Sequence, residues 1–145
     1  MTESHVFSDF DGDIYEYLQQ RESTNRFAQR TTDVKVVQAG LEFDVKTYII
    51  MSPMIYGLGS GLFNRQSIQI PAFIGQSIRS KQPVVIAEGQ ARWSNIHIDD
   101  LAGLYEFLLA QLLADKGLTT GEQGFYFSEN GESSWFDVSK AIAVV

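Results

Sequence analysis

Cysteine is absent from this chain of 145 residues, and histidine and proline are scarce, with two and three copies. Without cysteine the chain has no disulfides, thiolate metal ligands or cysteine nucleophile, which is compatible with the cytoplasmic location that we predict. The two histidines, His5 and His97, lie far apart in the sequence. We therefore predict no metal site, because a histidine site draws several such ligands together.

Long apolar runs and basic clusters are also missing. No window approaches about 18 consecutive apolar residues, so the sequence predicts no membrane span. The first residues are acidic and polar, unlike a signal peptide. Eleven Lys and Arg against eighteen Asp and Glu give a net charge of −7. The absence of a basic stripe argues against nucleic acid as a partner.

The residues that are present are those of an ordinary globular chain, with 44% hydrophobic and 20% charged residues. This length predicts a single domain over residues 1–145. Residues 1–21 lack a strong apolar pattern and are interpreted as a loose entry segment. Within it, Asp13 can cap a short helix that ends near Arg21, with Ile14, Tyr17 and Leu18 on one side.

The stretch from Lys46 to Gly61 is the most informative part of the chain. It opens with the apolar run 48–51, breaks at Pro53 and ends in a loop with three glycines. An apolar run of this length is typical of a buried strand in a parallel sheet. In α/β proteins, the loop that follows such a strand is where ligands bind.

Apolar periodicity predicts an alternation of helices and strands along the rest of the chain. The predicted helices cover residues 25–40, 71–81, 100–115 and 135–145, with Gly40, Asp99 and the capping box Ser134/Asp137 at their ends. The predicted strands cover residues 48–51, 84–86, 92–98 and 124–128. This order predicts an α/β fold, a partial Rossmann-like parallel sheet with helices on both faces.

Two short motifs have more than one interpretation. Asp9-Phe10-Asp11-Gly12 resembles the DxDG nucleophile motif of haloacid-dehalogenase-type phosphatases, but no apolar strand precedes it and Asp13 replaces the usual Thr. A solvated acidic loop is the alternative that we favour. The glycines of 57–61 can cradle a phosphate through backbone N–H groups or form a flexible turn. The loop matches neither GxGxxG nor a P-loop, which favours the turn.

Two further segments, in order, resemble a known family. Pro53-Met54-Ile55-Tyr56-Gly57 and, about forty residues on, Ile96-His97-Ile98-Asp99-Asp100-Leu101-Ala102 resemble the C-terminal half of the extended short-chain dehydrogenase/reductase family. These are the NAD-dependent epimerase/dehydratase proteins, and the similarity leans toward their NmrA-like relatives. The resemblance covers residues 22–145 and implies that the N-terminal dinucleotide-binding unit of the family is lacking from this chain.

The resemblance also implies a site. By analogy with the family, the residues that approach the nicotinamide of NAD(P) are Pro53, Met54, Ile55 and Tyr56. The pocket residues that we expect for a substrate are Asn64, Trp93, Asn95 and His97. The family's catalytic Tyr-x-x-x-Lys dyad is absent, because Phe27 and Thr31 stand at its places, so we expect no catalytic residue.

These observations predict a truncated or degenerate NAD(P)-binding epimerase/dehydratase-like protein without catalytic activity as this chain. The alternative is a non-catalytic binding or regulatory module of NmrA-like type, and a DxDG phosphatase-like protein is a remote third. A sheet that lacks its first strands would expose an edge and an apolar face. We therefore expect a homo-oligomer or a partner protein there, and a small-molecule ligand in the pocket.

Overall fold

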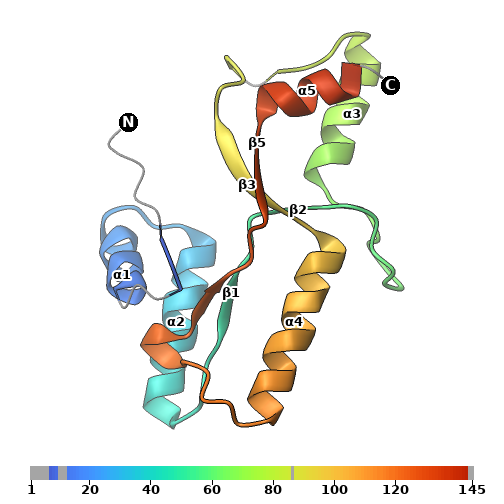
Figure 1. The fold of residues 1–145 in the computed structure, drawn as a ribbon. Coiled ribbons are helices and arrows are strands. Elements are labelled where there is room, and N and C mark those ends of the chain that lie inside the picture. The colour runs from blue at the N-terminus through green and yellow to red at the C-terminus, as the bar shows by residue number, and fades with distance from the viewer. Residues whose placement is uncertain (1–6, 10–12, 86, 144–145) are drawn as a thin grey trace. The chain divides into compact units, whose positions relative to one another are not determined.

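The computed structural model of the chain describes residues 7–9, 13–85 and 87–143, which form five α-helices, five short strands and one 3₁₀ turn (Figure 1). The helices are α1 Ile14–Thr24, α2 Ala28–Phe43, α3 Gln69–Ser80, α4 Ile98–Leu113 and α5 Trp135–Ala143. The strands are β1 Ile49–Met51, β2 Met54–Tyr56, β3 Arg92–His97, β4 Phe125–Phe127 and β5 Gly131–Ser134, and the 3₁₀ turn η1 is Gly121–Gln123.

The chain divides into two compact units. Unit 1 comprises residues 1–51 and 110–127, and unit 2 comprises residues 52–109 and 128–145. The single domain expected for the whole chain stays a prediction. Among the described residues, no helix has the length and apolar character needed to cross a membrane.

Unit 1 is built around a two-stranded parallel sheet, in which β1 pairs with β4. Its core centres on Phe125 and Val37, whose side chains are 1% and 0% exposed. Helix α1 contributes three buried side chains to this core. The short helix predicted after Asp13 is therefore confirmed and extends to Thr24, whereas the description of residues 14–21 as a loose segment is wrong. The remaining core residues of this unit are Ile14, Tyr15, Leu18, Val34 and Ile49.

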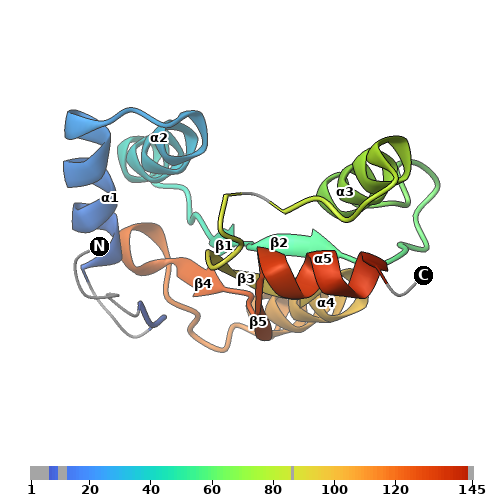
Figure 2. The ribbon, with the colours of Figure 1, turned by 90° about the horizontal axis from the view of Figure 1, so that it is seen from above.

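Unit 2 contains a three-stranded sheet in the order β2-β3-β5. Strands β2 and β3 are parallel and are joined through α3, which makes a βαβ unit (Figure 2). The edge strand β5 runs antiparallel to β3. The predicted α/β class and the partial Rossmann-like arrangement with flanking helices are confirmed, while the strands form two small sheets and one pairing is antiparallel.

The end of α2 differs from the expectation that Gly40 would cap it. The helix continues to Phe43, and the left-handed residue Asp44 ends it by donating its N–H to the carbonyl of Gly40. Gly40 is needed for another reason. A β-carbon there would lie 2.5 Å from Thr47 Cγ2 and 2.8 Å from the Val45 carbonyl oxygen, so glycine permits the chain to fold back closely.

The other helix ends follow the sequence signals more closely. Pro71 lies in the first turn of α3, where a missing N–H has no cost. The capping box before α5 is present: Asp137 N–H donates to Ser134 Oγ at 3.0 Å, and the Ser134 hydroxyl donates to Asp137 Oδ2 at 2.6 Å. Helix α4 begins at Ile98, so Asp99 lies in its first turn and does not precede it.

The strand expected over residues 84–86 is wrong for its described part, because Val84 and Val85 have no strand partner. Val84 N–H donates instead to the hydroxyl of Ser77 on α3, at 3.3 Å, and this contact docks the segment onto the helix. Residue 86 lies outside the described residues. Conversely, β5 was not predicted, since Gly131-Glu132-Ser133-Ser134 carries no apolar residue.

Candidate ligand-binding site

The two parallel strands of unit 2 bring the predicted site residues together. Met54 lies opposite Asn95, and Tyr56 lies opposite His97, in the register of β2 and β3. Because side chains alternate along a strand, Met54 and Tyr56 share one face of the sheet and Ile55 lies on the other. Residues about forty positions apart in the sequence thus become direct neighbours.

A pocket of about 1000 Å³ opens in unit 2. Helices α3 and α5, which can be followed in Figure 2, supply its apolar walls, and strands β2, β3 and β5 contribute Met54, Tyr56, Asn95 and Ser133. This volume is at the upper end of the range for small-molecule sites. The remaining lining residues are Gly57, Leu58, Gln66, Ser67, Ile70, Pro71, Ile74, Ser77, Ile78, Lys81, Gln82, Pro83, Val138, Ala141, Ile142 and Ala143.

The structure places the predicted site residues in different surroundings. Met54, Tyr56 and Asn95 line the pocket. Pro53, Ile55, Trp93 and His97 are not among its lining residues. Asn64 lies with Arg65 at a second depression, which shares Leu58, Gln66 and Ser67 with the pocket. Their roles in binding stay predictions.

Asn95 is a buried polar residue, 7% exposed, and its position is fixed by two neighbours. Its side-chain amide donates to Ser133 Oγ on β5 at 3.0 Å, and its backbone carbonyl accepts the N–H of Asn130 at 3.1 Å. A buried polar group that is held in this way keeps one orientation. Asn95 and Ser133 are therefore fixed polar points on a wall that is otherwise largely apolar.

The imidazole of His97 packs against Tyr56, a residue of the pocket lining. The two rings meet edge to face, with their centroids 5.3 Å apart. His97 Nδ1 accepts the N–H of Asp99 at 3.3 Å, and the Asp99 carboxylate lies 3.6 Å from the same nitrogen. These contacts hold the imidazole of His97 in place, and its Nε2 faces Gly57.

An aromatic cluster joins the helices of unit 2. Phe73 of α3 stacks on Trp135 of α5, with centroids 4.8 Å apart and planes 10° from parallel. Trp93 of β3 meets Trp135 at 5.6 Å in an edge-to-face contact. Trp93, which was expected in the pocket, is thus engaged in packing α5 onto the sheet, and its side chain is 48% exposed.

The glycine loop after β2 does not present a phosphate cradle at its centre. The N–H of Gly59 donates to the carbonyl of Arg65 at 2.7 Å, and the Arg65 side chain donates back to the Gly59 carbonyl at 2.8 Å. Leu58 pairs with Gln66 in an isolated antiparallel bridge. The loop therefore closes on itself as a small hairpin, and its backbone N–H at Gly59 is already bound.

The helical walls of the pocket were missed when the sequence was searched for polar site residues. On α3 the pocket side includes Ile70, Ile74 and Ile78, each four residues from the next. This stripe is visible in the sequence as a helical apolar face. A buried helix face and a pocket wall have the same apolar pattern, so the sequence could not distinguish them.

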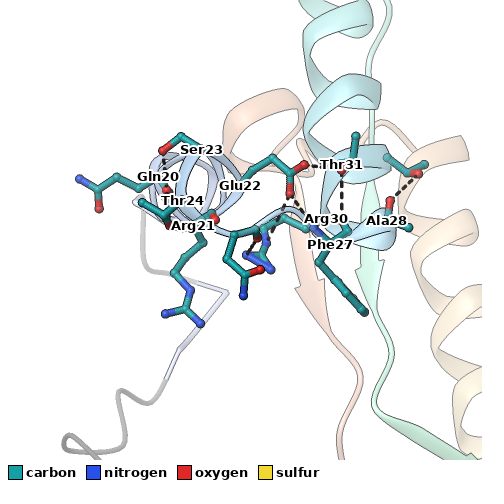
Figure 3. Close-up of polar contacts among 11 residues, drawn as sticks. Gln20, Arg21, Glu22, Ser23, Thr24, Phe27, Ala28, Arg30 and Thr31 are labelled. Carbon is teal, nitrogen blue, oxygen red and sulfur yellow. Dashed lines mark hydrogen bonds and ion pairs between the residues drawn. The ribbon is translucent and has the colours of Figure 1, made fainter.

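Unit 1 holds Phe27 and Thr31, which the sequence comparison placed at the dyad positions of the family that the chain resembles. Thr31 donates its hydroxyl to Glu22 Oε1, and Phe27 donates its N–H to Glu22 Oε2 at 3.2 Å (Figure 3). The Thr31 hydroxyl, the Phe27 N–H and the Arg30 charge lower the pKa of Glu22 against the opposing effect of desolvation. These contacts tie α1 to the start of α2, and they use the Thr31 hydroxyl structurally.

The remaining candidate motifs are only partly within the described residues. Asp9 accepts the N–H of Phe127 at 2.7 Å and so helps to fix β4. Phe10, Asp11 and Gly12, the rest of the DxDG motif, lie outside the described residues. In the part of the chain that the structure describes, no group of three or more His, Asp or Glu side chains is placed to hold a metal ion.

Comparison with known proteins gives one distant similarity to report. No protein-family model matches the chain. The chain is 25% identical over 107 residues to Oxidase ucsJ from an Acremonium species. The matched segment covers 68% of this chain and 31% of that protein, so the chain spans less than a third of the length of this relative.

Proposed function

We propose that unit 2 binds a small, largely apolar molecule in its pocket, as the substrate-side part of an oxidoreductase-related protein of the NAD(P)-binding epimerase/dehydratase type. The observation that carries the proposal is the pocket itself, in which Met54, Tyr56 and Asn95 come together from separate stretches of the chain. The distant similarity to an oxidase supports the oxidoreductase part of the proposal. The resemblance of residues 53–57 and 96–102 supports the family.

The lining residues suit one end of an NAD(P) cofactor and not the whole molecule. Met54 and Tyr56 offer an apolar and aromatic edge of the kind that can lie against a nicotinamide ring. Among the described lining residues there is one cationic side chain, and the Gly59 N–H is already bound within its loop. We therefore propose contact with the nicotinamide, which when bound supplies hydride transfer, and no pyrophosphate site among the described residues of this pocket.

A second candidate is a non-catalytic binding or regulatory module of NmrA-like type. The observation that favours it is the use of Phe27 and Thr31 in the junction between α1 and α2. Neither residue supplies the phenol or the ammonium with which the dyad exchanges a proton with a carbonyl or alcohol. Under this second proposal the pocket binds a regulatory ligand, and the chain does not catalyse a reaction of that ligand.

Calorimetric titration of the 145-residue chain tests the proposal. We expect 1-octanol, a neutral apolar probe, to bind to the wild type. We expect it to bind poorly to Ala141→Trp, in which an indole fills the pocket. The matched control is Ala102→Trp, since Ala102 is an exposed alanine of α4 that does not line the pocket. Equal binding by the wild type and Ala141→Trp would contradict the site.

Binding of NADH and NADPH, and oxidation of NADPH, distinguish the two proposed functions. We expect NADH and NADPH to bind more weakly than micromolar, because one cationic side chain in the lining offers little to a pyrophosphate. Micromolar binding would show that this chain holds a complete cofactor site. Steady oxidation of NADPH in the presence of carbonyl substrates would contradict the non-catalytic proposal, whatever the affinity.

A further inference from the structure

The pocket of unit 2 has opposed apolar walls. Ile70, Ile74 and Ile78 face it from α3, and Val138 and Ile142 face it from α5. The two helices are held together by the stacking of Phe73 on Trp135, which does not line the pocket. The apolar surface is therefore available to a ligand and is not consumed by contact between the helices.

The pocket follows the length of α3. Ser67 lies just before that helix and Ile70 in its first turn, and Ile78 and Lys81 lie at its end. Its 12 residues correspond to a rise of about 18 Å. A pocket of about 1000 Å³ drawn out over such a length suits an elongated ligand better than a compact one.

The only charged side chain among the described lining residues is that of Lys81, at the end of α3. The described lining residues include no Asp or Glu, although the whole chain has a net charge of −7. Within the described residues, Lys81 takes part in no ion pair. Lys81 is an exposed residue of the lining, and a lone lysine at the end of an apolar groove offers charge complementarity to one anionic group.

The ammonium of Lys81 is not needed to finish the helix. Lys81 is left-handed at φ 55°, and its backbone N–H donates to the Ile78 and Ser77 carbonyls. The Gln82 N–H also donates to the Ser77 carbonyl, at 3.2 Å. The Ser80 hydroxyl lies 2.9 Å from the carbonyl oxygen of Gln76. Since local groups cap these carbonyls, the side-chain charge is free for another partner.

We infer that the ligand of this pocket is an amphiphile, an elongated apolar molecule with one carboxylate end that pairs with Lys81. The inference rests on the proposed binding function and specifies its ligand class. The apolar body lies between α3 and α5 along the isoleucine stripe. The fixed polar side chains of Asn95 and Ser133 can hydrogen-bond to a hydroxyl or keto group on that body.

The test compares octanoate with 1-octanol by calorimetry, since the two probes share a chain length and differ in the anionic end. We expect the wild type to bind octanoate about fivefold to tenfold more tightly than 1-octanol, an advantage that shrinks as salt is added. In Lys81→Gln this preference is expected to disappear while 1-octanol binds as before. Circular dichroism checks that both proteins are folded.

Arg79→Gln is the matched control. It removes one positive charge from the last turn of the same helix, where Arg79 donates to Gln76 Oε1 at 2.9 Å and does not line the pocket. This variant should keep the preference for octanoate. Equal binding of both probes by the wild type, or loss of the preference in Arg79→Gln as well, would overturn the inference and leave the binding function standing. Failure of both probes to bind would overturn the inference and the binding function together.

Discussion

The imidazole of His97 lies so close to Gly57 that a β-carbon at position 57 would overlap it, with the ring carbon Cδ2 at 2.7 Å. Gly57 also has φ +101°, a backbone conformation that side chains of L-residues rarely adopt. The strand β2 ends at the residue before it, and Tyr56 packs on the same imidazole. Gly57 thus lets the pocket loop leave the sheet directly over His97.

Gly57→Ala should lower the free energy of unfolding of unit 2 by about 2 to 3 kcal/mol, through backbone strain and displacement of His97. Urea denaturation measures it. The control is Gly103→Ala in α4, where a β-carbon meets nothing within 4 Å. Because alanine is the better helix residue, that variant should gain about 0.5 to 1 kcal/mol. Equal stability of Gly57→Ala and the wild type would contradict the packing described.

Protonation of the Glu22 carboxylate in acid should lower the free energy of unfolding of unit 1. Its pKa is lowered in the folded chain, mainly by the Thr31 hydroxyl. The stabilisation is therefore present at pH above the unfolded value near 4.5 and is lost as the pH falls through the lower folded value. Glu22→Gln should be less stable than the wild type at neutral pH, and the difference should vanish in acid.

The comparison for Glu22 is Glu42→Gln, which removes the same charge from an exposed position on α2. Urea unfolding of both variants is followed at neutral pH and well below pH 4.5. A gap between Glu22→Gln and the wild type that stays constant across this range would show that the carboxylate is not stabilised by Thr31 and Phe27.

The capping box at the start of α5 should contribute a measurable free energy of unfolding. Ser134→Ala removes the oxygen that accepts the Asp137 N–H, and we expect a loss of about 1 kcal/mol. Ser134→Thr keeps an accepting hydroxyl and should lose much less. Thermal or urea unfolding distinguishes them, and equal losses in both variants would assign the effect to packing of the side chain.

Large apolar side chains on the surface of unit 2 should make the protein associate. Leu62, Phe63 and Ile68 are 90%, 85% and 87% exposed. Exposed apolar groups of this kind mark association surfaces. We expect a dimer or larger species in size-exclusion chromatography with light scattering, and a shift toward monomer in the double variant Leu62→Ser/Phe63→Ser. A monodisperse wild-type monomer would contradict this.

The parts of the fold that sequence reasoning could reach are those with a strong local signal. The apolar run before Pro53 marks a strand, the leucine pattern marks α4, and Ser134 with Asp137 marks the start of α5. Each signal is carried by neighbours in the sequence, so it survives without knowledge of the tertiary fold.

Features that depend on tertiary contacts were out of reach. β5 carries no apolar residue and exists because β3 lies beside it. Val84 is apolar and β-branched, but its N–H bonds to Ser77 and forms no ladder. Gly40 has the pattern of a helix cap, yet the close approach of Val45 and Thr47 is what requires it.

In the candidate site, too, some residues could be predicted from the sequence and others could not. Met54 and Tyr56 could be selected because they stand in a motif that resembles a family, and Asn95 because it directly precedes the second motif. The α3 wall could not, because an apolar helix stripe predicts burial whether the neighbour is protein or ligand. Lys81 gave no signal in the sequence, and it becomes informative only as the one charged side chain in the described lining.

The most direct test of the binding pocket is an amide chemical-shift map of the isotopically labelled chain during titration with octanoate. The account predicts shifts concentrated at residues that line the pocket on three elements, represented by Tyr56, Ile74 and Val138. Amides of the unit 1 core, such as those of Val37 and Phe125, should remain in place. Shifts centred on unit 1, or saturation without any shift at the pocket residues, would contradict it.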